Sequence, residues 1–518
     1  YVDYTFTPRI SPLDLGPDCG NGVPTTIRVW VNPTPAIRVH ARDSILCNGD
    51  SAVIWINNPN AFLNGEWEYD LAVVADPEIS GWRPDANGIT DTLLIDPLIN
   101  HDTIVHKVEY TFTPTKTPDP DICAGGQDTT IVIWVNPTPE VRVTVTDTVL
   151  CDGDDVSLTL RNPNVNVRGD WEGTLEIIPD PGITGILGIS EPFTGDASYG
   201  PYTLGNTSNE ARRVIFRFTP RIHGEYGGYC DNGIDTTIVV WVNPVPDIDV
   251  AATDTLICNE ELAQFKISTP NTQVRGNWLY DLDVEADGEI SGARGDGIYP
   301  IDSILIEDML TNNDTVAHKV TYHFTPFIES SDLQGNCGSE RDTIITIWVN
   351  PTPRIFVDFP DTIFCNNDTA FISVLDGLGN PVLGDPVYVV TADYNDSNVT
   401  VISRADGVPE TWSAGTPITD IYVNHTLEAH PVDYTFRPRI LDTRTGYEGA
   451  YCSGEDITVR IWINPTPGIA VDVPDTIICD NNNVLINVST QQGSVVGGSL
   501  IYELDVTYDG TAVSGSIT

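Results

Sequence analysis

The chain is poor in basic residues, in methionine and in long apolar runs. Its 518 residues include only 25 Lys and Arg against 74 Asp and Glu, so the formal net charge is −49 at pH 7. This shortage of cations argues against binding to nucleic acids or anionic membranes, which need positively charged patches. No apolar run approaches the roughly 20 residues of a transmembrane helix. A single Met beside ten Cys indicates an oxidising, extracytoplasmic setting.

Helical signals are also missing, whereas strand signals are frequent. No segment shows a convincing amphipathic period of 3.6 residues, but apolar and polar residues alternate in segments rich in Val, Ile and Thr. Because 40% of the residues are hydrophobic, we do not expect disorder. Short strands separated by Asn-, Asp- and Gly-rich turns predict an all-β fold of the sandwich type.

An internal repeat dominates the sequence. The string Trp-Val-Asn-Pro-Thr-Pro occurs at 30–35, 134–139 and 348–353, with close copies at 241–246 and 462–467. The Trp residues of these strings are 104, 107, 107 and 114 residues apart. An aromatic strand precedes each string, and an Asp-Ser/Thr-x-x-Cys block follows it. Such long-range similarity predicts tandem domains.

We place the domain boundaries in the Asn-Pro-x-Pro strings. Complete modules are then predicted at 36–139, 140–246, 247–353 and 354–467. Residues 1–35 correspond to the last strands of a partial module, and residues 468–518 to the first strands of another. Two explanations stay open: the chain is a window on a longer array, or neighbouring chains complete each other by strand donation.

Aromatic residues indicate where the cores of these modules lie. Trp67, Trp171 and Trp278 each follow a Gly by two residues at the expected third strand, which resembles the core Trp of an immunoglobulin-like sandwich. Alternating aromatics such as Tyr110 and Phe112 are predicted to face the core. The predicted fold is therefore all-β: a tandem array of immunoglobulin-like β-sandwich domains forming an extended rod.

The order of these blocks resembles a known family. The run V-x-Y-T-F-T-P, C-x-G, T-T-I-x-V-W-V-N-P-T-P and D-T-I-x-C is similar to the PKD-like, immunoglobulin-like tandem repeats of giant Bacteroidota cell-surface proteins. Gliding-motility adhesins exported by type IX secretion are the best-known carriers of such repeats. The resemblance covers the whole chain, and it implies an extracellular, cell-surface filament or adhesin.

From the repeats and the resemblance we expect a mechanical, non-catalytic repeat region. Two alternatives stay open: spacer modules of a giant secreted enzyme or carbohydrate-binding protein, and an S-layer-like lattice protein. The expected partners are copies of the chain in a filament, or further modules of a longer array, together with surface glycans. We expect no nucleic acid partner and no membrane insertion in this segment. No zinc-protease, serine-nucleophile, phosphate-loop or dinucleotide motif occurs in the sequence.

The cysteines recur at two places in the repeat. One follows the first strand, at Cys47, Cys151, Cys258, Cys365 and Cys479, and one precedes the last strand, at Cys19, Cys123, Cys230, Cys337 and Cys452. A disulfide-closed hairpin at Asn32-Pro33-Thr34-Pro35 is disfavoured, because the fourth residue lacks the N–H that closes a β-turn. We therefore expect the string to be a stiff, extended linker.

With seven-strand sandwich topology, the turn after the first strand lies at the bottom of a module, and the loop before the last strand lies at its top, facing the previous module. The first-turn cysteine of one module can then reach the loop cysteine of the next. The predicted interdomain disulfides are Cys47–Cys230, Cys151–Cys337 and Cys258–Cys452, each of which would clamp two neighbouring modules. Pairing within a module, such as Cys47 with Cys123, and unpaired buried thiols are the alternatives. We expect the other cysteines to pair with neighbouring modules: Cys19, Cys123, Cys365 and Cys479. Metal-type C-x-x-C spacing is absent.

Two further patterns suggest modification and metal binding. Asp followed by Ser or Thr and a small or aliphatic residue is similar to the O-glycosylation sequon of Bacteroidota, although the same pattern also suits the start of a strand. The implied acceptors are Ser44, Thr103, Thr148, Thr255, Thr315, Thr343, Thr362 and Thr476. Acidic turns offer oxygen ligands for calcium, with simple solvated turns as the alternative. The candidate ligands are Asp50, Asp154, Asp155 and Asp368.

Three histidines precede the aromatic strands of their modules. His106, His318 and His430 each lie four residues before the first aromatic residue of that strand, and Arg212 takes the place in the remaining module. We expect them to be strand-surface residues and not metal ligands.

Overall fold

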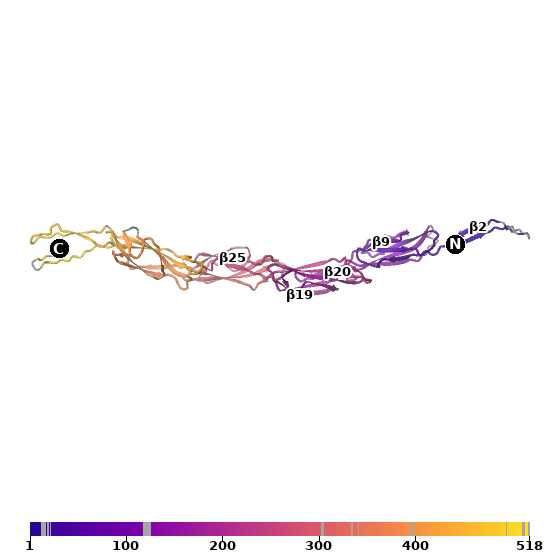
Figure 1. Cartoon of the computed structure of the whole chain (residues 1–518), viewed down its shortest axis with the longest axis horizontal. Coiled ribbons are helices and arrows are strands. Elements are labelled where there is room, and N and C mark those ends of the chain that lie inside the picture. The colour runs from indigo at the N-terminus through magenta and orange to yellow at the C-terminus, as the bar shows by residue number, and fades with distance from the viewer. Residues whose placement is uncertain are drawn as a thin grey trace. The chain divides into compact units, whose positions relative to one another are not determined.

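The computed structural model describes most of the chain. The described residues are 1–11, 17, 20, 22–117, 126–301, 305–332, 335–339, 341–394, 398–493, 495–509 and 513–515. Every regular element in these ranges is a β-strand (Figure 1). The described residues include no helix of the length and apolarity needed to cross a membrane. The chain forms two compact units, one of residues 1–246, 271–277 and 328–338, and one of residues 247–270, 278–327 and 339–518.

The first unit begins with a hairpin and continues with a sandwich of two sheets. Strands β1 (Val2–Phe6) and β2 (Thr25–Val29) form the hairpin, and all of their residues are exposed. One sheet of the sandwich has the order β3 (Arg38–Ala41), β5 (Ser51–Asn57), β9 (Leu93–Pro97). The other has the order β4 (Ile45–Leu46), β12 (Thr129–Val135), β11 (His106–Thr117), β6 (Glu66–Ala75), β8 (Ala86–Ile89). Strands β7 (Ile79–Ser80) and β10 (Ile99–Asn100) pair separately.

A second sandwich in the first unit repeats this plan. One of its sheets has the order β13 (Arg142–Val145), β15 (Asp154–Arg161), β19 (Ala197–Asn206), β17 (Ile183–Thr184). The other has the order β14 (Val149–Leu150), β22 (Thr236–Val242), β20 (Arg212–His223), β16 (Asp170–Pro179), β18 (Ile189–Thr194). Strand β21 (Tyr229–Cys230) pairs with β20. As in the first sandwich, the short first strand of the second sheet runs parallel to the last strand.

The second unit holds two more sandwiches of this type. The first is built from β23 (Asp249–Ala252), β25 (Glu261–Ser268), β29 (Leu305–Asn312), β27 (Ile290–Ser291), and from β24 (Leu256–Ile257), β32 (Thr343–Val349), β30 (His318–Glu329), β26 (Asn277–Ala286), β28 (Gly297–Pro300). The second is built from β33 (Ile355–Asp358), β35 (Thr369–Asp376), β39 (Ile418–Asn424), β37 (Val399–Val401), and from β34 (Ile363–Phe364), β42 (Ile457–Ile463), β40 (His430–Leu441), β36 (Asp385–Asp393), β38 (Glu410–Ser413). Strand β41 (Tyr451–Ser453) pairs with β40, and β43 (Ile469–Asp472) pairs with β44 (Asn487–Thr490).

The period-two pattern of the sequence explains these layers. Along β11 every second side chain from Val108 to Pro114 is buried between the two sheets, which is how a half-buried strand packs. Tyr110 and Phe112 are fully buried, as predicted. The structure therefore confirms the all-β fold of tandem immunoglobulin-like sandwiches.

The predicted core tryptophans belong to their cores: Trp171 is a buried member of the second core, and Trp67 and Trp278 are half-buried and pack against theirs. The indole N–H of Trp171 and that of Trp67 each donate to a main-chain carbonyl, at Glu140 and Ala36, at 3.1 Å. Because these carbonyls belong to the first residue after the proline-containing string, each Trp holds the chain where it enters its module. Tyr69 is fully buried in the first core, and its ring lies 5.8 Å from that of Trp67.

A buried ion pair supports three of the four sandwich cores. In the sandwich of residues 355–463, Asp420 accepts hydrogen bonds from the Tyr434 hydroxyl at 2.6 Å and from Arg404 at 3.1 Å. In the second unit, Asp308 is 5% exposed and accepts hydrogen bonds from the Tyr322 hydroxyl and from Arg294, both at 2.9 Å. Burial and the Asp308 carboxylate raise the pKa of the Tyr322 hydroxyl. In the first unit, the same arrangement joins Asp96 to Tyr110 and Arg83.

Candidate functional site: the junctions between modules

The Asn-Pro-Thr-Pro string at Asn136–Pro139 connects two strands that belong to different sandwiches. Strand β12 before the string pairs with β11, whereas β13 after it pairs with β15 in another sheet. The string at Asn136–Pro139 is therefore no hairpin turn, as predicted from its proline spacing. Three of its four residues are buried, so the linker is packed against its surroundings and not solvated.

The asparagine of each string binds the backbone of the following module. Asn243 is fully buried; its side-chain N–H donates to the Arg275 carbonyl at 3.1 Å, and its side-chain oxygen accepts the Arg275 N–H at 2.7 Å. Such a two-bond pair fixes position and orientation together. The same pair of bonds joins Asn32 to Asn64, Asn136 to Arg168, Asn350 to Leu383 and Asn464 to Gly497.

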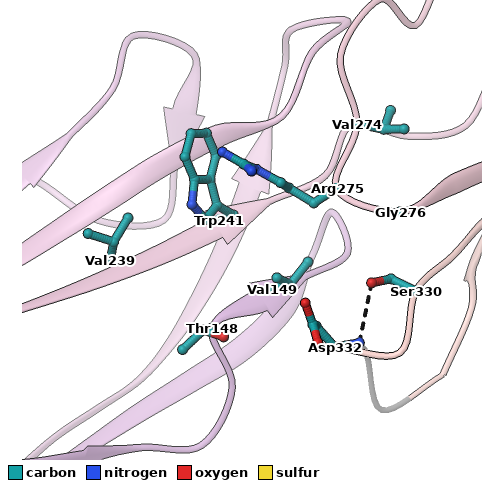
Figure 2. Close-up of a pocket in the computed structure, with 9 residues that line it drawn as sticks. All are labelled: Thr148, Val149, Val239, Trp241, Val274, Arg275, Gly276, Ser330 and Asp332. Carbon is teal, nitrogen blue, oxygen red and sulfur yellow. Dashed lines mark hydrogen bonds between the residues drawn. The ribbon is translucent and has the colours of Figure 1, made fainter.

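Two Trp–Arg contacts accompany these bonds in the first unit. The Arg275 guanidinium lies 3.6 Å from the centre of the Trp241 ring, and Figure 2 shows it placed over the indole. Arg168 lies 4.1 Å from the ring centre of Trp134 in the same way. A hollow of about 530 Å³ beside Trp241 is also lined by Thr148. Cation–π contacts of this kind contribute about 0.5–1 kcal/mol at exposed sites.

A backbone hydrogen bond also crosses four of these five junctions. The Ala211 N–H donates to the Gln273 carbonyl at 2.6 Å, and Glu210 and Gln273 also form a parallel bridge. Equivalent bonds run from Val105 to Asn166, from Ala317 to Pro381 and from Ala429 to Val495, each at 2.8 Å. The donor is in every case the residue before the first residue of the long aromatic strand.

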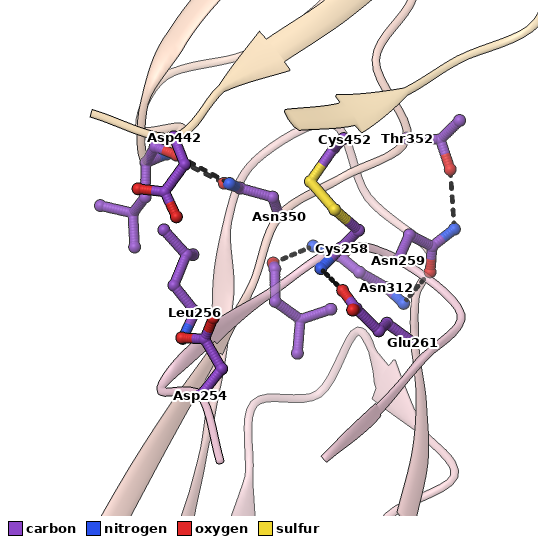
Figure 3. Close-up of a disulfide and its surroundings, with 12 residues drawn as sticks. Asp254, Leu256, Cys258, Asn259, Glu261, Asn312, Asn350, Thr352, Asp442 and Cys452 are labelled. Carbon is purple, nitrogen blue, oxygen red and sulfur yellow. Dashed lines mark hydrogen bonds between the residues drawn. A yellow bond between two sulfur atoms is a disulfide. The ribbon is translucent and has the colours of Figure 1, made fainter. Parts of the chain in front are cut away.

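Disulfides form the third attachment. Cys47 is bonded to Cys230, Cys151 to Cys337 and Cys258 to Cys452, with Cα–Cα distances of 5.3, 5.2 and 5.4 Å. Figure 3 shows the last of these between β24 and β41. These are the three pairs that the sequence predicts. Cys365 and Cys479 are exposed free thiols, and Cys19 and Cys123 lie outside the described residues.

The first-turn cysteine is positioned by a tight turn that an acidic residue closes. The Asp154 N–H donates to the Cys151 carbonyl at 3.2 Å, and the Asp154 carboxylate accepts the Cys151 N–H at 2.9 Å. Gly153 between them has φ +84°, a left-handed conformation that favours glycine. Glu261 closes the turn of Cys258 in the same way (Figure 3).

These turns give the acidic residues a structural role that the calcium hypothesis did not foresee. Asp50, Asp154 and Asp368 each take part in the turn after a cysteine, and Asp155 accepts a hydrogen bond from the Thr203 hydroxyl. Within the described part of the chain, no three His, Cys, Asp or Glu side chains are placed to hold a metal ion. We therefore propose no calcium role for them.

The residue after the cysteine links the turn to the linker. The Asn259 side-chain oxygen accepts the Asn312 N–H at 2.7 Å, and its amide donates to the Thr352 hydroxyl of the Asn-Pro-Thr-Pro string at 2.8 Å (Figure 3). Asn48 and Asn366 make the same bonds. In the remaining module the string has Val245 where the others have Thr, and Asp152 replaces Asn. The residue after the cysteine is thus an Asn, with an amide donor, only in modules whose string has a Thr hydroxyl to accept the bond.

An ion pair strengthens the junction around Cys258–Cys452. Arg444 contacts Asp254 at 2.6 Å and Asp442 at 2.6 Å, and its guanidinium holds the pKa of the Asp442 carboxyl below its usual range. Arg444 is part of the loop before Cys452, whereas Asp254 belongs to the Asp-Thr-Leu block before Cys258. The loop is therefore fixed by charge as well as by the disulfide.

His318 lies between two carboxylates beside this junction. Its Nε2 is 3.0 Å from Asp314 and its Nδ1 is 3.5 Å from Asp287, and the hydrogen bond to Asp314 raises the pKa of the imidazole. The next residue towards the N-terminus, Ala317, donates the bond that crosses the junction. Arg212 occupies the equivalent position in the second module and binds Glu210. The histidines are therefore hydrogen-bond partners of junction loops, His106 with Asp102, His318 with Asp314 and His430 with Thr426, which the sequence did not indicate.

The implied glycosylation acceptors divide into two groups. Those in the Asp-Ser/Thr blocks before the first-turn cysteines are exposed: Ser44, Thr148, Thr255, Thr362 and Thr476. Thr103, Thr315 and Thr343 are half-buried, and the Thr343 hydroxyl donates to the Ile248 carbonyl at 3.4 Å. Exposure therefore favours the first group as acceptors.

Comparisons with known proteins add no functional information to this description of the fold. No protein-family model and no curated protein sequence matches the chain. Among solved structures, it is similar to the ICAM-5 D1–D4 ectodomain fragment, with 12% identity and a TM-score of 0.33 over 82% of this chain and 99% of that one. It is also similar to invasin, a bacterial integrin-binding protein, with 11% identity and a TM-score of 0.29 over 85% of this chain and 82% of that one. The adhesin FdeC of Escherichia coli has 11% identity and a TM-score of 0.27 over 63% and 96%. At these scores none of the three supports an inference about function.

Proposed function

We propose that the chain is the structural repeat region of an extracellular bacterial surface adhesin or filament, and that its work is mechanical and not catalytic. The observation that carries this proposal is the recurrence of the junction attachments. An asparagine pair, a crossing backbone bond and a disulfide come together where one sandwich follows another. Modules that only needed to be spaced apart would not require three separate attachments.

The energetics of the attachments support a mechanical role. In the chain-entropy model, a disulfide that closes a loop of 183 residues stabilises the folded state by about 5 kcal/mol. Each hydrogen bond adds about 0.5–1.5 kcal/mol. A junction that combines these terms resists bending far better than a short flexible linker, which leaves neighbouring domains free to move.

The disulfides also support an extracellular location. Structural disulfides persist in oxidising compartments, and six of the ten cysteines form them in this structure. We propose that Cys19, Cys123, Cys365 and Cys479 make the same clamp with neighbouring modules of the array or filament. Following the family resemblance, we further propose type IX export in a member of the Bacteroidota, a part in gliding motility or surface adhesion, and O-glycans on the exposed acceptors.

Labelling of intact cells tests the proposed location. Antibodies raised against residues 36–467 should label unpermeabilised cells of the native host and should mark filaments in immunogold micrographs. Labelling that appears only after permeabilisation would refute a surface role. Mass spectrometry of the native protein tests the glycans: a peptide that contains Thr148 should carry a hexose-type mass increment, and an unmodified peptide would refute that part.

A further inference from the structure

The three disulfides close loops that overlap along the chain. The loop between Cys47 and Cys230 spans 183 residues and contains Cys151, whose own partner Cys337 lies outside it. The loop from Cys258 to Cys452 spans 194 residues and contains Cys337. If each disulfide stayed within its own module, the loops of different modules would not overlap; here they do, and this changes the covalent connectivity of the whole region.

The shortest covalent route through the region bypasses most of the backbone. From Cys47 it crosses the disulfide to Cys230, follows 28 residues to Cys258, and crosses the next disulfide to Cys452. At about 3.5 Å per residue, 28 residues span roughly 100 Å at full extension, whereas the backbone from Cys47 to Cys452 would span roughly 1,400 Å. With the disulfides intact, unfolding of the modules can therefore lengthen the region very little.

A second route shares no backbone with the first. It follows the chain from Cys47 to Cys151, crosses to Cys337, and follows the chain again to Cys452. We propose that the disulfides join Cys47 to Cys452 by two separate covalent routes. These routes bear load when modules unfold, and residues 47–452 stay covalently connected after any single backbone cut. This proposal rests on the disulfide pairing and not on the proposed location or on any adhesive partner.

The structure of the short route suits a load-bearing segment. Between Cys230 and Cys258 the chain forms β22, the packed linker Asn243–Pro246, and then β23 and β24. Strands already rise about 3.3 Å per residue, so little slack remains to be drawn out. The bypassed segments contain strongly exposed loop residues such as Phe62, which is 90% exposed, and proteolysis concentrates at such loops. The short route has an exposed segment of its own at 231–235.

Pulling on the two ends of the chain tests the load path. All variants carry Ser at the four cysteines without a described partner, so that no thiol can exchange. Removing Cys47–Cys230 leaves a shortest route of 104 + 79 = 183 residues through Cys151–Cys337 and Cys258–Cys452. Since 183 − 28 = 155, the fully extended chain should be longer by roughly 540 Å.

Removing the central disulfide is the matched control. The variant Cys151→Ser/Cys337→Ser also loses one disulfide, yet its shortest route still has 28 residues, so its full extension should not change. Removing Cys258–Cys452 should release 194 − 28 = 166 residues, or roughly 580 Å. A longer extension in the central variant, or no change in the outer ones, would overturn the proposed load path.

A cleavage experiment tests the double connection. A specific protease site inserted after Phe62 should leave one band on a non-reducing gel after complete cleavage, and two bands after reduction. The variant Cys47→Ser/Cys230→Ser should split without reductant, whereas Cys151→Ser/Cys337→Ser should not. If the two fragments of the cleaved parent protein separate without reductant, the proposed double connection is refuted. Because both assays use the isolated chain, their failure would leave the proposed surface location untouched.

Discussion

Replacing one linker asparagine should loosen one junction selectively. Asn243→Ala removes both hydrogen bonds to the Arg275 backbone, of 3.1 and 2.7 Å, from a side chain that is fully buried. Two lost bonds at about 0.5–1.5 kcal/mol each give about 1–3 kcal/mol for opening of this contact. The Cys151–Cys337 disulfide keeps the neighbouring loop attached, so the sandwiches themselves should stay folded.

Hydrogen exchange of the Arg275 amide measures this effect directly, because that N–H is the donor to Asn243. A loss of about 1–3 kcal/mol corresponds to exchange that is about 5- to 150-fold faster. Asn32→Ala is the matched control, because Asn32 makes the same pair of bonds to Asn64 but is only half-buried. Water can replace these bonds, so exchange of the Asn64 amide should become less than about fivefold faster. Equal effects in both variants would refute the argument from burial, and no effect in Asn243→Ala would refute the role of the asparagine.

Three further predictions follow from the same contacts. Because the pKa of His318 is raised in the folded state, its ion pairs stabilise the junction fully below about pH 6.5 and are lost as the pH rises through the raised value. Hydrogen exchange of the Ala317 amide should therefore become about two- to fivefold faster between pH 6 and 8.5, relative to exchange of the Ala211 amide. Ala211 is the control because its neighbour is Arg212, which stays charged over this range. A constant ratio would contradict this. Tyr322→Phe leaves buried Asp308 without one donor and should lower the stability of its sandwich by about 1–3 kcal/mol, seen as faster proteolysis in urea; unchanged proteolysis would contradict it. Asp152→Asn with Val245→Thr should stabilise the second module more than the sum of the single changes, and additivity in a double-mutant cycle would refute the coupling.

The sequence predicts the layers of the fold well because they depend on short-range patterns. The alternation along segments such as His106–Thr117 indicates a strand with one buried face, and the repeat indicates how often the sandwich recurs. The order of strands within each sheet is set by long-range pairing, which follows from resemblance to the immunoglobulin plan and not from the local pattern. The hydrogen bond from the Trp67 indole to the Ala36 carbonyl could not be predicted, since the two residues are 31 positions apart.

The disulfides could be predicted because proline chemistry restricts the linker. Once Pro35 rules out a closed turn, the two cysteines on either side of the string must lie far apart, and the next module offers the nearest partner. The asparagine bonds could not be predicted in the same way. Asn at the start of the string suits a turn as well as a packed linker, and only its burial against the next module distinguishes the two.

The co-variation of residues among the repeats supplies a signal that a single module lacks. Three modules pair Asn after the cysteine with Thr in the string, and the module with Val245 has Asp152 instead. The buried Arg–Asp–Tyr group varies in the same manner. The first module has Arg83, Asp96 and Tyr110, which bind one another. The second module has Leu187, Tyr202 and Phe216 at the matching places. Because a buried donor without an acceptor is costly, such groups are expected to change together. Comparing repeats within one chain therefore identifies contacting residues where comparison among homologues would otherwise be needed.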